Sequence, residues 1–122
     1  SSELIAVSSI QNLVKNNISG SSHTDLLKGD MAYGSFLEQK GFPSVPSVAD
    51  PVPLQMDNYF SGGYNTANYS SYMGGAIDGI QLECNRSGLR ETQAEREAFA
   101  VAFVSATVLF LETHYFEELP KL

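Results

Sequence analysis

The longest apolar stretch of the chain lies at residues 98–111, AFAVAFVSATVLFL, where Ser105 and Thr107 are the only polar residues. Thr92 and Glu95 precede it with the T-x-x-E spacing of a capping box, which predicts a helix that begins after Thr92. A helix that is apolar on all sides is usually buried. Its 14 residues are too few to cross a bilayer. We therefore expect a core helix that is covered on most sides.

The first half of the chain predicts shorter elements. Residues 4–7 favour a strand followed by a turn or helix, and residues 24–29 favour a second strand. Residues 32–40 predict a helix that stops at a glycine. Prolines are concentrated between residues 43 and 53, and they predict an extended connector because proline lacks an amide donor.

Residues 57–84 form a loop followed by a strand pattern. The loop is rich in Gly, Asn, Tyr and Ser, and its tyrosines suit either ligand recognition or packing. Apolar and polar residues then alternate over 76–84, which predicts a strand with Glu83 at its end. The same alternation places Cys84 opposite Glu83, as a buried and inert thiol.

Charge and composition narrow the function classes. The chain has 122 residues, which fits one domain, with 43% hydrophobic and 17% charged residues. Its net charge of −7 and its scattered basic residues argue against a nucleic-acid partner. The chain begins at Ser1 without Met, which we interpret as a processed start. N-x-S sequons at Asn17, Asn68 and Asn85 make these residues candidate glycosylation sites, as in a secreted protein. The single cysteine allows no internal disulfide.

The apolar helix is large for so small a chain. A domain of this size buries only about two thirds of its surface, and few other elements are available to wrap the helix. We expect another chain, or a segment outside this one, to cover part of it.

Several motifs together resemble the C-terminal part of the N-formylglutamate amidohydrolase family. The strongest part spans 59–83, with Tyr-Phe-x-Gly-Gly-Tyr-Asn-Thr and Ile-Asp-Gly-Ile-Gln-Leu-Glu. The weaker pieces are Ser-Ser-Ile at 8–10, Leu-Leu-Lys-Gly at 26–29, the segment 34–41, the Pro-Ser pairs at 43–44 and 46–47, Arg90, and the last helix through His114-Tyr115.

This resemblance implies an α/β fold: part of a zinc-carboxypeptidase-like mixed sheet flanked by helices, with a buried C-terminal helix. Residues 1–122 would be a single domain or the C-terminal portion of a larger one, completed by an N-terminal segment or a second chain. The family's general base and acid is the Glu at the end of the Ile-Gln-Leu-Glu strand, which corresponds to Glu83. Gln11, Tyr64, Asn65 and Thr66 would contact a small-molecule or peptide substrate.

The sequence also departs from the family pattern. Zinc is implied as the cofactor, but its ligands lie in upstream segments that this chain lacks, so no metal ligand is assigned here. Gln11 stands where the family often has an Arg that binds the substrate carboxylate, and Tyr69 stands where a His is frequent.

Two functions therefore remain open. The first is the C-terminal chain of a secreted, zinc-dependent amidohydrolase or carboxypeptidase-like protein, formed by proteolytic processing as a heterodimer. The second is a secreted glycoprotein without catalysis, with a binding, storage or structural role. Glu83 is then only a solvated acid. The H-x-x-E spacing of His114 and Glu117 can hold zinc, although a His at a helix end also complements the helix dipole. His23 is expected to be solvated.

Overall fold

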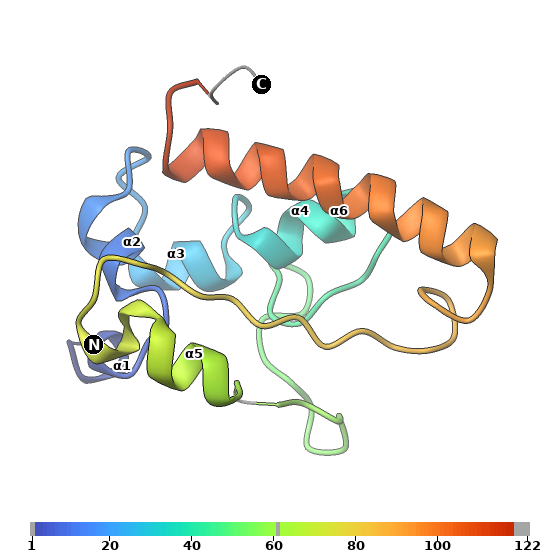
Figure 1. Ribbon diagram of the computed structural model, residues 1–122, viewed down its shortest axis with the longest axis horizontal. Helices are drawn as coiled ribbons and strands as arrows, with labels where there is room; N and C mark the ends of the chain where they lie inside the picture. Colours follow the sequence, from blue (N-terminus) through green and yellow to red (C-terminus); the bar gives the residue numbers. More distant parts are fainter. Residues whose placement is uncertain (1, 61, 119–122) are drawn as a thin grey trace.

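The computed structural model describes residues 2–60 and 62–118, and these residues fold into helices joined by long irregular segments (Figure 1). The helices are α1 (Ser2–Ala6), α2 (Gln11–Asn16), α3 (His23–Lys28), α4 (Tyr33–Gln39), α5 (Tyr64–Tyr69), the 3-10 turn η1 (Ser71–Met73) and α6 (Gln93–His114). The described part of the chain contains no strand. The predicted α/β fold with a mixed sheet is therefore wrong.

Helix α6 begins where the sequence predicted. Thr92 is its N-cap, and the Thr92 side chain accepts a hydrogen bond from the Glu95 amide, while the Glu95 carboxylate accepts from the Thr92 amide. The helix runs for 22 residues. A buried stripe recurs every fourth residue, at Ala102, Ala106, Phe110 and His114. Such a stripe fits a helix packed on one side.

The expected burial of α6 on most sides is wrong for this structure. Val101 and Val104 keep 73% and 59% of their surface exposed. Val101 lies in the N-terminal half of α6, which in Figure 1 extends beyond the shorter helices, and Val104 lies at the middle of the helix. An apolar sequence is necessary for a buried helix, but burial also requires elements to cover it, and the described residues supply few of them.

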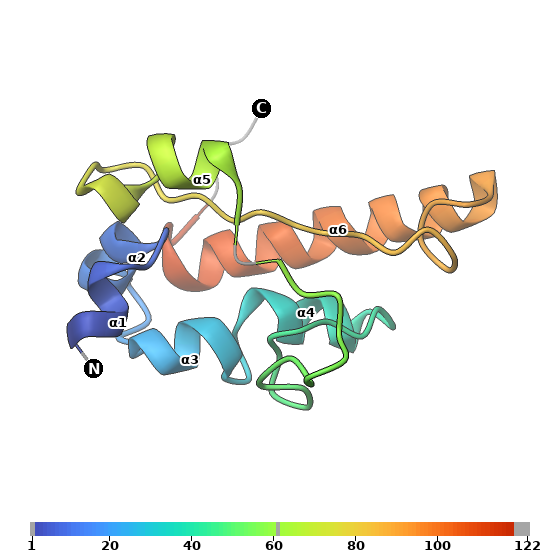
Figure 2. The ribbon, with the colours of Figure 1, turned by 90° about the horizontal axis from the view of Figure 1, so that it is seen from below.

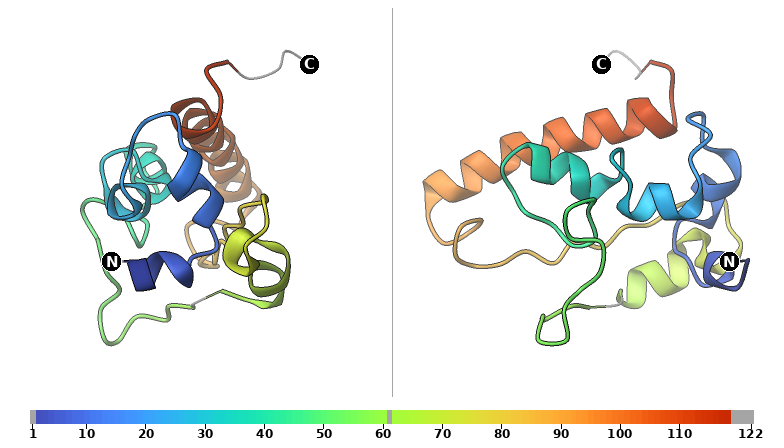
Figure 3. Two further views of the ribbon diagram at one scale, coloured as in Figure 1. Left: turned by 90° about the vertical axis from the view of Figure 1, so that its left-hand side faces the viewer. Right: turned by 180° about the vertical axis from the view of Figure 1, so that it is seen from behind.

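The hydrophobic core lies between the C-terminal half of α6 and the helices α2, α3 and α4. Its buried members are Ile10, Leu13, Leu26, Phe36, Leu37, Ala106 and Phe110. Tyr33 packs edge-on against Phe110, with 5.4 Å between ring centroids, and its hydroxyl lies 2.7 Å from the Thr107 hydroxyl. Figure 3 shows α3 and α4 on one side of α6 and α5 on the other.

Two predicted strands are helices. Residues 24–29 fall mostly in α3, which Ser22 and Asp25 begin with a reciprocal capping box. Residues 4–7 fall mostly in α1, where Leu4 is 61% exposed. In segments this short, a run of apolar residues does not distinguish a strand from a helix. The helix predicted at 32–40 is confirmed as α4.

The connector rich in proline lies against α4. A Cβ atom at Gly34 would collide with the Pro46 carbonyl oxygen, so only glycine allows this close approach. Ser35 reinforces the contact, because its hydroxyl accepts a hydrogen bond from the Val48 amide at 2.9 Å.

Residues 76–84 form no strand, so this prediction is wrong; the segment 75–85 runs extended and pairs with no strand in the described part of the chain. Figures 1 and 2 show this segment passing α5 and running alongside α6 toward its first turn. The Gly79 amide donates to the Ser9 carbonyl at 3.0 Å. Among the described residues, no backbone–backbone bond involves residues 80–85. A β-strand requires a hydrogen-bonded neighbour, so the alternating pattern by itself produced only an extended chain.

None of the helices in the described ranges combines the length and the apolar content that crossing a membrane requires.

Candidate functional site

A polar cluster formed by residues far apart in the chain surrounds the Asp78 carboxylate. Its Oδ1 accepts from the Ser71 hydroxyl at 2.6 Å and from the Leu13 amide at 3.2 Å. Its Oδ2 accepts from the Asn12 side chain at 3.1 Å and from the Tyr115 hydroxyl at 2.9 Å. This one carboxylate therefore joins α2, η1 and the C-terminal end of α6.

Two of these partners are constrained by burial. Ser71 is completely buried, and its hydroxyl also lies 3.0 Å from the Ser9 carbonyl. Burial of Tyr115, together with the hydrogen bond to Asp78 and the negative charge of Asp78, raises the pKa of the Tyr115 phenol well above its ordinary value. The phenol therefore remains a neutral hydrogen-bond donor to Asp78.

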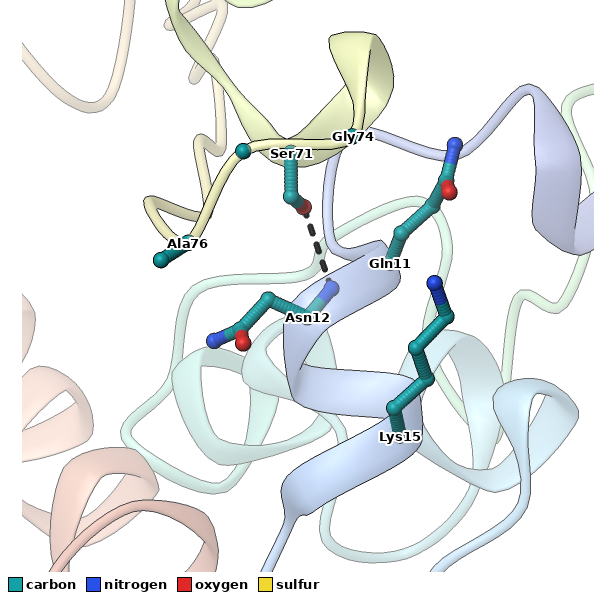
Figure 4. A pocket seen from close by; sticks show the side chains of 7 residues that line it. Gln11, Asn12, Lys15, Ser71, Gly74 and Ala76 are labelled. Carbon is teal, nitrogen blue, oxygen red and sulfur yellow. Dashed lines mark hydrogen bonds between the residues drawn. The ribbon is translucent and has the colours of Figure 1, made fainter.

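A cleft of about 210 Å³ lies beside this cluster, between α2 and the 74–76 turn. Figure 4 shows the side chains of Gln11, Asn12, Lys15 and Ser71 lining it. Among the described residues, the one ion pair is that of Arg86 with Glu91, so no carboxylate neutralises Lys15. A polar cleft with an unpaired ammonium group suits a small anionic or polar ligand.

Gln11, a predicted substrate-binding residue, lies in this cleft. Its amide nitrogen donates to the Ala6 carbonyl at 2.8 Å and to the Tyr72 carbonyl at 3.3 Å. Both of its N–H donors are therefore in use, and its carbonyl oxygen is the group left for a ligand.

Glu83, the predicted catalytic residue, lies in the extended segment and is exposed. Its Oε1 accepts from the Gln81 side-chain amide at 2.6 Å. The Gln81 side chain in turn lies over Gly63, where an added Cβ would be 2.6 Å from the Gln81 Oε1. Gly63 is the N-cap of α5, so the Glu83 carboxylate is linked through Gln81 to the start of that helix.

Helix α5 carries the other predicted substrate-binding residues. Tyr64 is 72% exposed, Asn65 is exposed and Thr66 is half-buried. The Thr66 hydroxyl lies 3.0 Å from the Gly63 amide, and the Thr66 methyl group is close to Gly79. The structure thus brings the segment of Glu83 beside Gly63 and Thr66, whereas Gln11 belongs to the cleft at α2, whose lining does not include Glu83.

No metal site is found in the described residues. They contain no group of three or more His, Cys, Asp or Glu side chains that could hold a metal ion. His114 is completely buried; its Nδ1 lies 2.7 Å from the Ser19 hydroxyl, and its Nε2 lies 2.8 Å from the Met31 carbonyl oxygen. Since both ring nitrogens are engaged, the H-x-x-E pair is not available to a metal, and Glu117 is exposed.

Three further predictions concern single residues. His23 was expected to be solvated, but it begins α3, and its Nε2 is buried with no hydrogen-bond partner in the described residues. Cys84 is a free thiol, and it is half-buried. Of the sequon asparagines, Asn68 and Asn85 are exposed, while Asn17 is half-buried.

Sequence reasoning did not single out Asp78, Ser71 or Lys15. Their roles depend on contacts between residues far apart in the chain, such as the bond between Asn12 and Asp78 across 66 positions. The one sequence signal for Asp78 was its carboxylate within the predicted strand, since a charge that is buried there requires partners.

No protein-family model, no curated protein and no solved structure matches this chain.

Proposed function

We propose that this chain is the carboxylate-bearing part of a metal-dependent amide hydrolase of the kind it resembles, with Glu83 as general base and acid. The observation that carries the proposal is the position of the Glu83 segment along α5. Gln81, the hydrogen-bond partner of Glu83, lies over Gly63, and Gly79 of the same segment lies close to Thr66, one of the residues expected to contact a substrate.

The chemistry assigned to Glu83 is proton transfer. The carboxylate accepts a proton as water attacks the amide carbonyl, and it returns that proton to the leaving amine. The products are a carboxylic acid and an amine. The bond from Gln81 orients the Glu83 carboxylate, which is one requirement for a positioned base.

The residues of this chain do not fit a zinc site, because the described ranges hold no cluster of metal ligands. Zinc, which would polarise the amide carbonyl when bound, would need ligands from outside this chain. We propose that a second chain from the same precursor supplies them.

The exposed apolar surface supports such a partner. Val101 on α6 and Ile77 on the extended segment are 73% and 71% exposed, and Ile80 is 47% exposed. Apolar residues exposed in this way are the surface that a partner would cover. A chain that covers them also excludes water from Glu83, and charges interact more strongly in such a drier site.

We further propose that the protein is secreted and glycosylated, on the basis of its three sequons.

The test uses the protein isolated from its source, with any accompanying chain. We expect two chains, zinc in stoichiometric amount, and hydrolysis of N-acyl amino acids. Recombinant two-chain protein carrying Glu83→Gln should lose this hydrolysis by at least about 100-fold, the usual contribution of a general base. Glu97→Gln, a change at another exposed acid, is the matched control and should leave it intact.

A second function is supported by a specific observation. Glu83 is exposed, and the described residues form no metal-ligand cluster near it. A secreted glycoprotein with a binding, storage or structural role requires neither a buried catalytic carboxylate nor a metal site. Isolated protein that lacks both metal and hydrolysis would favour this function over the hydrolase.

A further inference from the structure

The sequon at Asn17 lies in the most densely bonded loop of the molecule. The Asn17 side-chain nitrogen, at the C-terminus of α2, lies within hydrogen-bond distance of three carbonyl oxygens. These are Leu13 O at 3.1 Å, Val14 O at 3.4 Å and Ser21 O at 3.1 Å. The Asn17 side-chain oxygen Oδ1 accepts from the Ser21 amide at 2.8 Å. Asn17 therefore ends α2 and closes the 17–21 loop.

The other two residues of this sequon attach the loop to α6. The Ser19 hydroxyl lies 2.7 Å from His114 Nδ1 and 2.9 Å from Asn17 Oδ1. The Ile18 amide donates to the His114 carbonyl at 3.0 Å. His114 is completely buried, so these bonds are shielded from water. All three residues of the tripeptide thus hold the loop against the end of α6.

A sugar on Asn17 is incompatible with this arrangement. In N-glycosylation the amide nitrogen loses one hydrogen and forms a bond to the sugar C1, and a lipid-linked diphosphate leaves that carbon. The modified Asn17 nitrogen would keep one hydrogen for three carbonyl acceptors. The sugar would also occupy the space beside the Leu13 and Ser21 carbonyls, in a half-buried position. Unpaired and displaced polar groups of this kind are strongly destabilising.

The other two sequons lack these constraints. Asn85 is exposed, and no hydrogen bond among the described residues involves its side chain. Asn68 is exposed on α5, and its nitrogen makes one bond, to the Tyr64 carbonyl at 2.8 Å, which leaves its second hydrogen replaceable. A sugar on either residue can extend into solvent.

We propose that the fold selects among its sequons: Asn85 and Asn68 are glycan sites, and Asn17-Ile18-Ser19 is a structural lock that must stay unmodified. Transfer to the nascent chain precedes folding, so a chain with a sugar on Asn17 cannot close the loop and is retained by the cell. The biological relevance of this selection rests on the proposed secretion.

The experiment supplies a secretory leader ahead of the chain and expresses it in eukaryotic cells, so it does not depend on the native location or on hydrolase activity. Glycosylated sites are identified by enzymatic removal of the sugars in heavy-oxygen water, followed by peptide mass spectrometry. We expect the secreted protein to carry sugar on Asn85 and Asn68 and none on Asn17.

Two matched variants sharpen the test. Ser19→Thr and Ser87→Thr each keep the sequon hydroxyl and favour glycan transfer at Asn17 and Asn85, respectively. Ser19→Thr should lower the secreted yield several-fold and enrich the retained protein in Asn17 glycan, whereas Ser87→Thr should not reduce secretion. Ser19→Thr protein made in bacteria carries no glycan and should melt within a few degrees of wild type. This control separates the effect of the sugar from that of the added methyl group.

Secreted protein with sugar on Asn17 and an unchanged melting temperature would overturn the proposal. Secreted protein in which neither Asn68 nor Asn85 carries a sugar would also overturn it.

Discussion

The C-terminal end and the middle of α6 lie in or next to the apolar stretch 98–111, but they are held very differently. At the C-terminal end, His114 is completely buried and bonded to Ser19 and Met31, and the adjoining Tyr115 donates to Asp78. Toward the middle of the helix, Val101 and Val104 are 73% and 59% exposed. The apolar residues 98–111 therefore created the potential for burial, whereas the buried polar bonds of His114 and the bond of Tyr115 fix the C-terminal end.

We expect the packed part of α6 to determine the stability of the fold and the exposed part to affect association. The packed end supplies the core and the polar network, so substitutions there should unfold the protein. The open end contributes little to folding of the single chain, so substitutions there should act mainly on association. Each of the following experiments tests this division.

The largest effect is expected from His114→Ala. The Met31 carbonyl can only accept, so in neutral His114 the proton is on Nε2 and Nδ1 accepts from Ser19. Removing the ring leaves a cavity and unpaired buried groups, which should lower the free energy of unfolding by about 3 kcal/mol in urea titrations. Val104→Ala is the matched control and should change it by less than about 0.5 kcal/mol. Equal losses at the two sites would remove the distinction between the ends.

A smaller loss is expected from Asp78→Asn. The variant keeps the size of the side chain but turns one acceptor oxygen into a donor that faces other donors, either the pair on Oδ1 or the pair on Oδ2. We expect the free energy of unfolding to fall by about 2 kcal/mol. Tyr115→Phe removes a single bond and should cost about 1 kcal/mol. In the double variant, Asp78→Asn with Tyr115→Phe, the loss of unfolding free energy should be clearly smaller than the sum of the two single losses. Additive losses would mean that Tyr115 is not bonded to this carboxylate in solution.

The smallest effect concerns acid stability. Burial lowers the pKa of His23 below its ordinary value of 6.5. In the pH range between the two values the unfolded chain binds more protons than the folded chain, so stability falls as the pH drops below about 6.5. The melting temperature should decline between about pH 7 and pH 5, and His23→Gln should flatten that decline. A decline of the same steepness in the variant would assign it to other groups.

Local signals in the sequence predicted two of the helices, α6 and α4, but missed α3 despite its capping box at Ser22 and Asp25. The Thr92 and Glu95 capping box located the first turn of α6, and the α4 helix was found from its pattern and its glycine stop. These signals act within a few residues, so they do not depend on the rest of the fold.

The predicted sheet is absent from the described residues, because a strand forms only where a neighbouring strand pairs with it. Residues 76–84 have the alternation of a strand, yet their backbone finds almost no partner among the described residues. The predicted site residues do not share one cleft. Gln81, which bonds to Glu83, lies over Gly63 at the start of α5, whereas Gln11 lines the cleft at α2. The Asp78 cluster joins four segments of the chain, and no local pattern reveals such a convergence.

The length of α6 has a consequence for the kinetics and the entropy of assembly. At about 1.5 Å per residue, its 22 residues make a rod of about 33 Å, anchored firmly at one end. An incoming chain would meet an apolar surface that is already ordered, so less conformational freedom is lost on binding than if the helix had to form at the same time. Association should then be limited by encounter and orientation rather than by a folding step.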